Sequence, residues 1–455
     1  MTKKMVAKAS LISIPVAIFL ILQSQGIGIF SIVSMLEPKN IQIPPNHVRT
    51  GLMMAQSGSN IYIAWIDNNV SHNVLFRMSK DAGKSFEPII NLNDNEGRSV
   101  TRSIASEGSA VHVAWIDDTN GNLDVLFRRS VDGGKTFDAT VNLSNNHGNS
   151  EFVVLDAEGP AIYAVWIDDV YGNAEIFFRE SQDAGLTFGS TLNLSNNQGS
   201  SEAPMVLSEG SNVYVVWHDD TEGNFDVLFR ASYDNGKTFG HVMNLSSSKV
   251  NSGFAVLTAS GPNVYVAWIE ECMGKQEIFF RASNDGGITF GPTINLSNSK
   301  AKSTLPTIDV SGSLACVAWV DEGVEMMEEL LVSCSMDGQS FKDTVRIANG
   351  NDLRSSVIDV EGIDVYVTWI DKGTAVNGMF IRTSNDAGSS FLPAVNITVG
   401  RIEDAIIDVE ATNVYAIWSD KQCLDQECHS IKVNTYFMRS IDRGFTFEAP
   451  IKISK

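Results

Sequence analysis

All eight tryptophans of the chain recur at one spacing, and this period constrains the fold more than any other feature. Successive tryptophans are 50, 51, 51, 51, 51, 50 and 49 residues apart. A constant period of about 50 residues indicates one supersecondary unit repeated along the chain, with each unit buried against its neighbours. We therefore expect one long repeat domain within the 455 residues. The eight positions are Trp65, Trp115, Trp166, Trp217, Trp268, Trp319, Trp369 and Trp418.

The repeat that spans residues 202–246 shows what one unit contains. Its segments EAPMVLSEG, NVYVVWHDD, FDVLFRASYD and FGHVMNLS are rich in β-branched and aromatic residues, without helical periodicity. They predict four strands of five to eight residues, joined by short turns. Four-stranded units repeated around an axis form a β-propeller. The sequence thus predicts an all-β propeller of eight four-stranded blades over residues 38–455.

The two ends of the repeat region are both complete. The first repeat contains its own first strand, near residues 50–57, and the last repeat ends with its own fourth strand, Phe447–Ser454. The phase of the repeats therefore does not require a blade shared between the two ends of the chain.

A turn of the form S-x-D-x-G-x-[S/T]-F recurs between the third and fourth predicted strands. Seven copies are complete, and an eighth, SMDGQSF at 335–341, is shortened. The aspartate can accept backbone N–H bonds within the turn, the glycine supplies a positive φ, and the phenylalanine is expected to enter the blade core. The pattern predicts a structural turn. Its aspartates are Asp81, Asp132, Asp183, Asp234, Asp285, Asp337, Asp386 and Asp442.

An arginine recurs in the third predicted strand of seven repeats, within strings such as LFR and FFR. We expect it to be structural and to pair with a neighbouring carboxylate. The positions are Arg77, Arg128, Arg179, Arg230, Arg281, Arg382 and Arg439.

The repeated turn resembles the Asp-box, or BNR repeat, of sialidase-like β-propellers. The eight copies recur in phase with the tryptophans, and the repeats that contain them cover about 410 residues. The resemblance implies that the turns are structural and lie away from the active face. It also implies a propeller with more blades than the six of the sialidases themselves.

The resemblance does not extend to the catalytic residues of the sialidases. These enzymes use a Tyr nucleophile paired with a Glu, an Asp acid/base and three arginines. The first blade lacks the F/Y-R-I-P motif, and HVRTG at 47–51 is the nearest substitute. No Tyr–Glu pair can be assigned, so the catalytic residues of an enzyme of this type stay unknown.

The N-terminus differs from the repeats. Lys3, Lys4 and Lys8 precede an uncharged stretch from Ala9 to Leu36. Lysines before an apolar stretch are typical of exported chains, and about 28 residues can span the hydrocarbon core of a bilayer. We expect residues 1–37 to be a signal peptide or a signal-anchor transmembrane helix, although a buried helix is an alternative. The propeller would then be extracytoplasmic, either membrane-anchored or secreted.

Charge and cysteine content exclude some functions. A formal net charge of −21 disfavours nucleic-acid partners, because phosphate binding requires clustered Lys and Arg. Five cysteines are too few for a disulfide scaffold. Cys316 and Cys334 would oppose each other on adjacent strands and could form a disulfide, and Cys423 and Cys428 could close an acidic insert. The alternative for each pair is a reduced, buried state.

The loops between the second and third strands of repeats 2 to 4 are acidic at both ends, as in DDTNGNLD, DDVYGNAE and DDTEGNFD. Such loops could supply several of the six to eight oxygens that Ca²⁺ prefers. The alternative is an Asx turn that closes a hairpin. No other cofactor is indicated. The carboxylates are Asp117, Asp118, Asp124, Asp168, Asp169, Glu175, Asp219, Asp220 and Asp226.

Charged residues also precede or begin the first strand of several repeats, where they would surround the top of a central channel. Guanidinium groups bind carboxylates in a bidentate manner, so the arginines could bind an acidic sugar. Salt bridges between blades are the alternative. The arginines of repeats 7, 8, 1 and 2 and the glutamates of repeats 3 and 4 are Arg354, Arg401, Arg49, Arg98, Arg102, Glu151 and Glu202.

The tripeptide N-L-S recurs at 142–144, 193–195, 244–246 and 295–297, with NIT at 396–398 and NVS at 69–71. Each matches an N-glycosylation sequon and predicts a glycoprotein if the cell modifies its exported proteins.

The near-uniform period leaves no long insertions between blades, where active-site loops would be expected. We therefore expect an exported, cell-surface propeller that is a non-catalytic binding or scaffold module for a protein or glycan, acting through its top face. The alternative is a sialidase-like exo-glycoside hydrolase that acts on acidic sugars.

Overall fold

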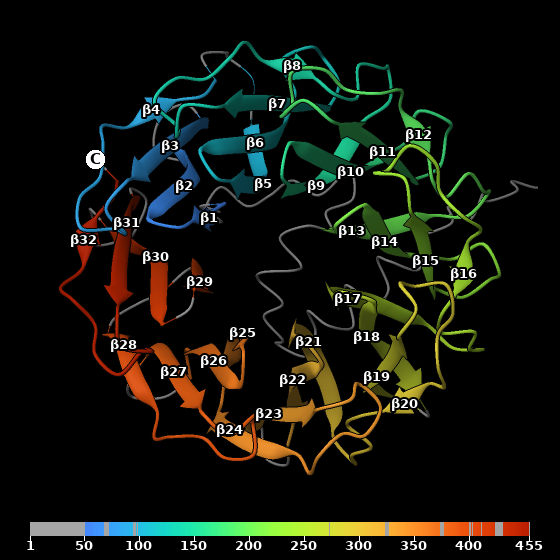
Figure 1. Cartoon of the computed structure of the whole chain (residues 1–455), viewed down its shortest axis with the longest axis vertical. Coiled ribbons are helices and arrows are strands. Elements are labelled where there is room, and N and C mark those ends of the chain that lie inside the picture. The colour runs from blue at the N-terminus through green and yellow to red at the C-terminus, as the bar shows by residue number, and fades with distance from the viewer. Residues whose placement is uncertain are drawn as a thin grey trace, which may run out of the picture.

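The computed structural model describes residues 51–455 except 68–71, 94–96, 98, 273, 324–326, 374–376, 400–401, 403, 411, 424–430 and 455. These residues form a closed ring of eight blades around a central axis, as Figure 1 shows. Each blade is a sheet of four consecutive antiparallel strands, so the all-β, eight-bladed prediction is confirmed. The described residues include no helix long and apolar enough to cross a bilayer. The predicted N-terminal segment lies outside them.

The strands are numbered in chain order, and four successive strands make one blade. Blades 1 to 4 consist of β1 (Met53–Ser57), β2 (Asn60–Asp67), β3 (Asn73–Ser79), β4 (Ile90–Asn91), β5 (Ser99–Glu107), β6 (Ala110–Asp117), β7 (Asp124–Ser130), β8 (Val141–Asn142), β9 (Ser150–Glu158), β10 (Ala161–Asp168), β11 (Glu175–Ser181), β12 (Leu192–Asn193), β13 (Ser201–Glu209), β14 (Asn212–Asp219), β15 (Asp226–Ser232) and β16 (Met243–Asn244). Blades 5 to 8 consist of β17 (Ser252–Ser260), β18 (Asn263–Cys272), β19 (Lys275–Ser283), β20 (Ile294–Asn295), β21 (Lys302–Ser311), β22 (Leu314–Glu322), β23 (Glu328–Ser335), β24 (Val345–Gly350), β25 (Leu353–Glu361), β26 (Asp364–Asp371), β27 (Gly378–Ser384), β28 (Val395–Val399), β29 (Asp404–Glu410), β30 (Asn413–Cys423), β31 (Ile431–Ser440) and β32 (Ile451–Lys452).

The outermost strand is shorter than the sequence predicts. It has only two residues in β4, β8, β12, β16, β20 and β32. In blade 4 the residues before β16, which the sequence assigned to this strand, bind a side chain instead of the neighbouring strand. The carbonyl oxygens of Phe239 and Gly240 accept hydrogen bonds from the Arg230 guanidinium. A short edge strand also offers little template for pairing with another chain.

The second strand of each blade explains the continuous apolar runs of the sequence. Strand β14 is covered on both faces, and Val213 to Trp217 are fully buried. Trp217 packs into a cluster with Val165 and Phe178 of the preceding blade. Tyr214 packs into the cluster shared with the following blade. Each tryptophan therefore marks one interface between neighbouring blades. Because the second strand is buried on both faces, its sequence does not alternate between apolar and polar residues.

Ring closure uses the same contacts as the other interfaces and needs no shared blade. Trp65 of blade 1 packs with Tyr415 and Ile417 of blade 8. The Arg77 guanidinium donates to the carbonyl oxygen of Ile453 at 2.8 Å. The N–H of Gly58 donates to Glu410 at 3.1 Å. The prediction of two complete terminal blades is confirmed.

The Asp-box turns are structural, as predicted. In blade 4 the Asp234 carboxylate accepts bonds from the Ser232 hydroxyl at 2.8 Å, the Thr238 N–H at 2.9 Å and the Thr238 hydroxyl at 2.6 Å. The N–H of Gly236 donates to the Ser232 oxygen at 2.9 Å. The equivalent bonds from Ser85 lower the pKa of Asp81 to about 2. Each aspartate thus organises the turn as an acceptor.

Asp-box turns also contact the preceding blade, which corrects the expectation that their phenylalanine enters the blade's own core. Phe239 packs edge-on against Phe178 of blade 3, with ring centroids 4.9 Å apart. A Cβ atom at Gly236 would lie 2.9 Å from Phe178 and 3.2 Å from Tyr163 of blade 3. Glycine is therefore required both for its φ of +79° and for the close approach of the two blades.

We expect Gly236→Ala to lower the free energy of unfolding by about 2 kcal/mol more than Gly261→Ala. Gly261 also has a positive φ, +56°, but its Cβ position has nothing within 4 Å. Both variants carry the conformational cost of a positive φ, and only the first adds the clash between blades. Urea unfolding followed by tryptophan fluorescence measures both losses. Equal losses of stability would show that the two blades accommodate the added methyl group without cost, and would contradict this prediction.

The recurrent arginine binds backbone carbonyls and not the carboxylate that the sequence suggested. Arg230 donates to the carbonyls of Gly240 at 2.8 Å and Phe239 at 3.2 Å in its own blade, and to that of Leu194 in blade 3 at 2.9 Å. Five donors in a planar fork can serve several carbonyls at once. Two of the seven differ. Arg439 binds the Glu448 carboxylate at 2.7 and 2.9 Å as well as the Ala82 carbonyl at 2.7 Å, and Arg281 donates to the Thr293 hydroxyl.

Arg230→Ala is expected to lower the free energy of unfolding by about 2 kcal/mol, because it leaves partly buried carbonyls without donors. Arg281→Ala is the matched control. Its guanidinium makes a single hydrogen bond in the described structure, to the Thr293 hydroxyl at 2.9 Å. The control should lose less than half as much in the same urea titration. A larger loss for Arg281→Ala would contradict the assigned role.

Candidate functional site at the inner rim of the top face

The two ends of the blades carry different loops, which define two faces. The turns between the first and second strands and the Asp-boxes meet at one end, where the Ala82 N–H donates to the Ser59 carbonyl at 2.9 Å. We call this the bottom face. The loops between the second and third strands and the links between blades meet at the other end, where the Ser150 N–H donates to the Leu123 carbonyl at 2.7 Å. We call this the top face.

The acidic loops of the top face bind the link that leads into their own blade. Asp219 accepts bonds from the Ser201 hydroxyl at 2.5 Å, from the Asn197 amide at 2.5 Å and from the Thr221 N–H at 2.9 Å. Asp220 accepts from the N–H of Ser200 at 2.6 Å. Asp117 and Asp168 repeat the bond to the serine that starts the innermost strand. These carboxylates close the loops as Asx turns.

The carboxylates that begin the third strands bind the end of the outermost strand. Asp226 accepts from the Ser246 hydroxyl at 2.8 Å and from the Asn244 amide at 2.9 Å. Asp124 accepts from Ser144 at 3.1 Å, and the Glu175 carboxylate accepts from an asparagine of β12. In the part of the chain that the structure describes, no group of three or more His, Cys, Asp or Glu is arranged to hold a metal ion. Calcium binding stays a prediction.

The N-L-S tripeptides form part of this network. In blade 4, the side-chain oxygen of Asn244 accepts from the Ser247 N–H at 2.7 Å, while Ser246 accepts from the Val227 N–H at 3.0 Å. The amide nitrogen that would carry a glycan donates to Asp226. The repetition of the sequon therefore has a structural cause, and the structure lends no support to its use for glycosylation.

The predicted charged rim is only partly described. Glu151, Glu202 and Arg354 occupy the same register position, opposite Ile167, His218 and Ile370 respectively. The Arg354 guanidinium forms an ion pair with Asp352. Arg49, Arg98, Arg401 and the side chain of Arg102 lie outside the described residues. Of the predicted cysteine pairs, Cys316–Cys334 is confirmed as a disulfide, whereas Cys428 and the Cys423 side chain also lie outside the described residues.

Irregular backbone marks this rim. The innermost strands β5, β9, β13, β17, β21 and β25 each contain a register shift just after the rim position. Phe152, Ala203, Phe254 and Leu305 adopt positive φ there, between 48° and 63°. A bulge re-aims the neighbouring side chains, and bulges are common beside binding sites.

An imidazole–carboxylate pair at the rim was missed by the sequence prediction. His218 Nε2 lies 3.7 Å from Glu202, whose other oxygen accepts from the Ser200 hydroxyl at 2.9 Å. The imidazole is 7% exposed and lies edge-on to Phe225. Its Nδ1 has no hydrogen-bond partner in the described structure.

A signal for this pair was present in the sequence. The residue after the tryptophan is isoleucine or valine in six repeats, serine in repeat 8 and histidine only in repeat 4. The pair can hold a polar group of a ligand or exchange a proton with it. It is the part of the described rim that departs most clearly from the repeat.

Comparisons with known proteins find similarity to solved structures alone. No protein family and no curated protein matches the sequence. Solved structures that match include an ulvan lyase, a polysaccharide lyase, at 10% identity and a TM-score of 0.49, covering 73% of this chain and 91% of that one. The endosialidase of phage phi92 matches at 11% identity and 0.43, covering 77% and 69%. A mutant NanB sialidase of Streptococcus pneumoniae matches at 11% identity and 0.37, covering 72% and 66%.

The chain is thus similar in structure, at low identity, to sialidase-like propellers, and Ser–Asp hydrogen bonds of the Asp-box type recur in its blades.

Proposed function

We propose that the protein is a non-catalytic binding or scaffold propeller that acts outside the cytoplasm and engages a protein or glycan at its top face. One observation carries this proposal. Between β5 and β22, the polar groups of the top loops bind one another in nearly the same way, and Glu202 with His218 is the pair that departs from this pattern. A rigid frame that carries one distinctive polar pair is suited to recognition.

The location outside the cytoplasm has two supports. The sequence predicts an exported chain, and the Cys316–Cys334 bond belongs to a class that persists in oxidising compartments.

Binding and hydrolysis assays on the same preparations test the proposal. We would measure turnover of a fluorogenic sialic-acid glycoside and binding to a glycan array by the full-length protein. The variants are Glu202→Gln, Arg354→Ala and His218→Ile, the last of which restores the residue found in most repeats. We expect no turnover, and ligand binding that His218→Ile weakens at least tenfold. Turnover that these variants abolish would overturn the proposal in favour of a sialidase-like hydrolase.

A further inference from the structure

The bottom face exposes apolar side chains that the fold does not require. Twelve large apolar side chains are exposed in the described structure, and eight of them stand on bottom-face turns. Leu186 and Ile288 are each 61% exposed, and Ile441 is 60% exposed. We call the eight residues the bottom collar: Val131, Leu186, Tyr233, Ile288, Met336, Ile363, Ile441 and Phe445.

Seven collar residues occupy two of the three variable positions of the Asp-box turn, the one after the serine and the one after the glycine. The turn is held by its Ser, Asp, Gly and Thr, as the bonds around Asp234 show. Blade 1 has Lys80 and Lys84 at the same positions, and both are exposed. Since lysine serves the turn equally well, the apolar choice in most other blades has no structural cause. Exposed apolar side chains that share one face and are not used by the fold point to an interaction surface.

Carboxylates lie inside the collar, around the axis. The last residue of the innermost strand is a glutamate in β5, β9, β13, β25 and β29. Some of these also bind the next blade, as when Glu209 accepts from the Gly261 N–H at 2.7 Å. We call them the inner acidic ring: Glu107, Glu158, Glu209, Glu361 and Glu410.

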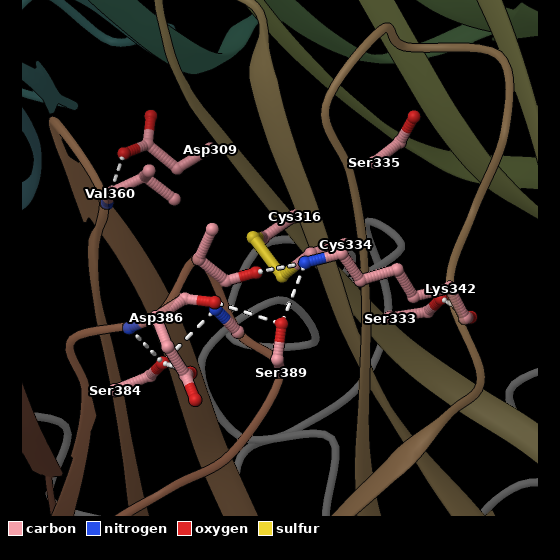
Figure 2. The surroundings of a disulfide bond; sticks show 12 residues. Asp309, Cys316, Ser333, Cys334, Ser335, Lys342, Val360, Ser384, Asp386 and Ser389 are labelled. Carbon is pink, nitrogen blue, oxygen red and sulfur yellow. Dashed lines mark hydrogen bonds between the residues drawn. A yellow bond between two sulfur atoms is a disulfide. The ribbon is translucent and has the colours of Figure 1, made fainter.

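Four aspartates form a second layer, two residues before the ring position. Asp156, Asp309, Asp359 and Asp408 are half-buried on β9, β21, β25 and β29. Asp309 accepts from the Val360 N–H of the next blade at 2.7 Å, as Figure 2 shows. Burial, together with the charges of Asp309 and Asp408, raises the pKa of Asp359 to about 8. The negative charge at the bottom end of the axis near neutral pH therefore comes mainly from the inner acidic ring, because the raised pKa values leave the second layer partly protonated.

Charge selects among the possible occupants of this face. A second copy placed bottom to bottom would bring two acidic rings together, which is repulsive. A bilayer with anionic lipids would be repelled in the same way. In addition, β1 runs from the top face to the bottom turn at Gly58, so the described chain enters the propeller at the top face, away from the collar. A protein segment with cationic and apolar side chains complements both features.

We propose that the bottom face docks a partner protein through a cationic amphipathic segment, with Lys or Arg side chains directed to the inner acidic ring and apolar side chains on the bottom collar. This inference rests on the proposed binding function and adds a second surface to it. The lysines of the face, such as Lys80 and Lys84, stand on the outer turns between the third and fourth strands, whereas the ring stands on the innermost strands.

A labelled peptide of alternating Leu and Lys tests the docking surface by fluorescence anisotropy on the full-length protein. We expect saturable binding, and no binding of a Leu–Glu peptide of the same length. The collar variant L186S/Y233S/I288S and the ring variant E361Q/E410Q should each weaken binding at least tenfold. Tyr171→Ser is the matched control, because Tyr171 is 70% exposed on the top face. It should leave binding unchanged, and circular dichroism confirms that all variants are folded.

Three outcomes would overturn this inference. Equal binding by all variants would show that the peptide does not use the collar. Binding to phosphatidylcholine–phosphatidylglycerol vesicles that the collar variant abolishes would assign the face to a bilayer. Dimerisation in sedimentation velocity that the same variant abolishes would assign it to a second copy. Turnover of the sialic-acid glycoside would contradict the proposed function and leave these results unaffected, so the two failures are distinguishable.

Discussion

Raising the pH from 5 to 9 is expected to lower the free energy of unfolding by about 3 kcal/mol, because of the half-buried aspartates around the axis. Burial raises the pKa of Asp309 to about 6, of Asp408 to about 7 and of Asp359 to about 8. Glu361 faces the same region and also raises the pKa of Asp359. This free energy is smaller than the three pKa shifts would give in full, because solvent screens the charges of half-buried groups.

The sign follows from the protons bound in each state. An aspartate in the unfolded chain loses its proton near pH 4. The folded protein keeps these protons until about pH 6 to 8, so it binds more protons than the unfolded chain in this range. Stability is therefore highest near the unfolded pKa and falls as pH rises through the folded values. At lower pH the Asp-box has the opposite effect. The lowered pKa of Asp81 and Asp285, each about 2, makes their contribution disappear as pH falls below 4.

Urea unfolding at pH 5, 7 and 9, followed by tryptophan fluorescence, measures this dependence. Asp359→Asn should remove much of the loss at pH 9, since the amide stays neutral. Asp386→Asn, in the Asp-box of the same blade, is the control. Its pKa is lowered to about 2, so its removal should leave the alkaline loss intact. A stability that rises between pH 5 and 9 would contradict the assignment.

Reduction of the Cys316–Cys334 disulfide is expected to lower the free energy of unfolding by about 3 kcal/mol. The bond joins directly opposed residues of β22 and β23 and closes a loop with a sequence separation of 18. Closing a loop of this size lowers the conformational entropy of the unfolded chain, and this loss corresponds to about 3 kcal/mol at 25 °C. Thermal unfolding with and without reductant measures the effect.

The loss of stability on reduction should be largest at the interface between blades 6 and 7. Cys316 stands where most blades have tyrosine, and a Cβ atom at Gly388 of blade 7 would lie 2.3 Å from the Cys334 sulfur, which shows how closely the blades approach. Lys342 reinforces this interface through the Ser389 hydroxyl at 2.7 Å and the Ala387 carbonyl at 3.2 Å (Figure 2). Hydrogen exchange should therefore increase first in β23 and β25. The double variant C316A/C334A is the control, and its stability should not respond to reductant. If the native protein does not respond either, the bond contributes nothing.

The sequence by itself determined the number of blades, the order of strands within them and the role of the Asp-box. These properties depend on contacts within one repeat or on the period of one buried residue type. The turn around Asp234 uses partners at most four residues away, and the tryptophans indicate the interfaces simply by recurring every 49 to 51 residues. The pairing of Cys316 with Cys334 was predictable for the same reason, since both belong to one hairpin.

Only the tertiary structure decided which partners the polar groups use across blades. Arg230 binds the Leu194 carbonyl 36 residues away, and Asp309 binds the Val360 N–H 51 residues away. These contacts depend on the angle and spacing of packed sheets, which no local pattern encodes. The same holds for the acidic layer around the axis and for the bottom collar. Seven of the eight blades contribute side chains that are ordinary in the sequence, and only the closure of the ring gathers them on one face.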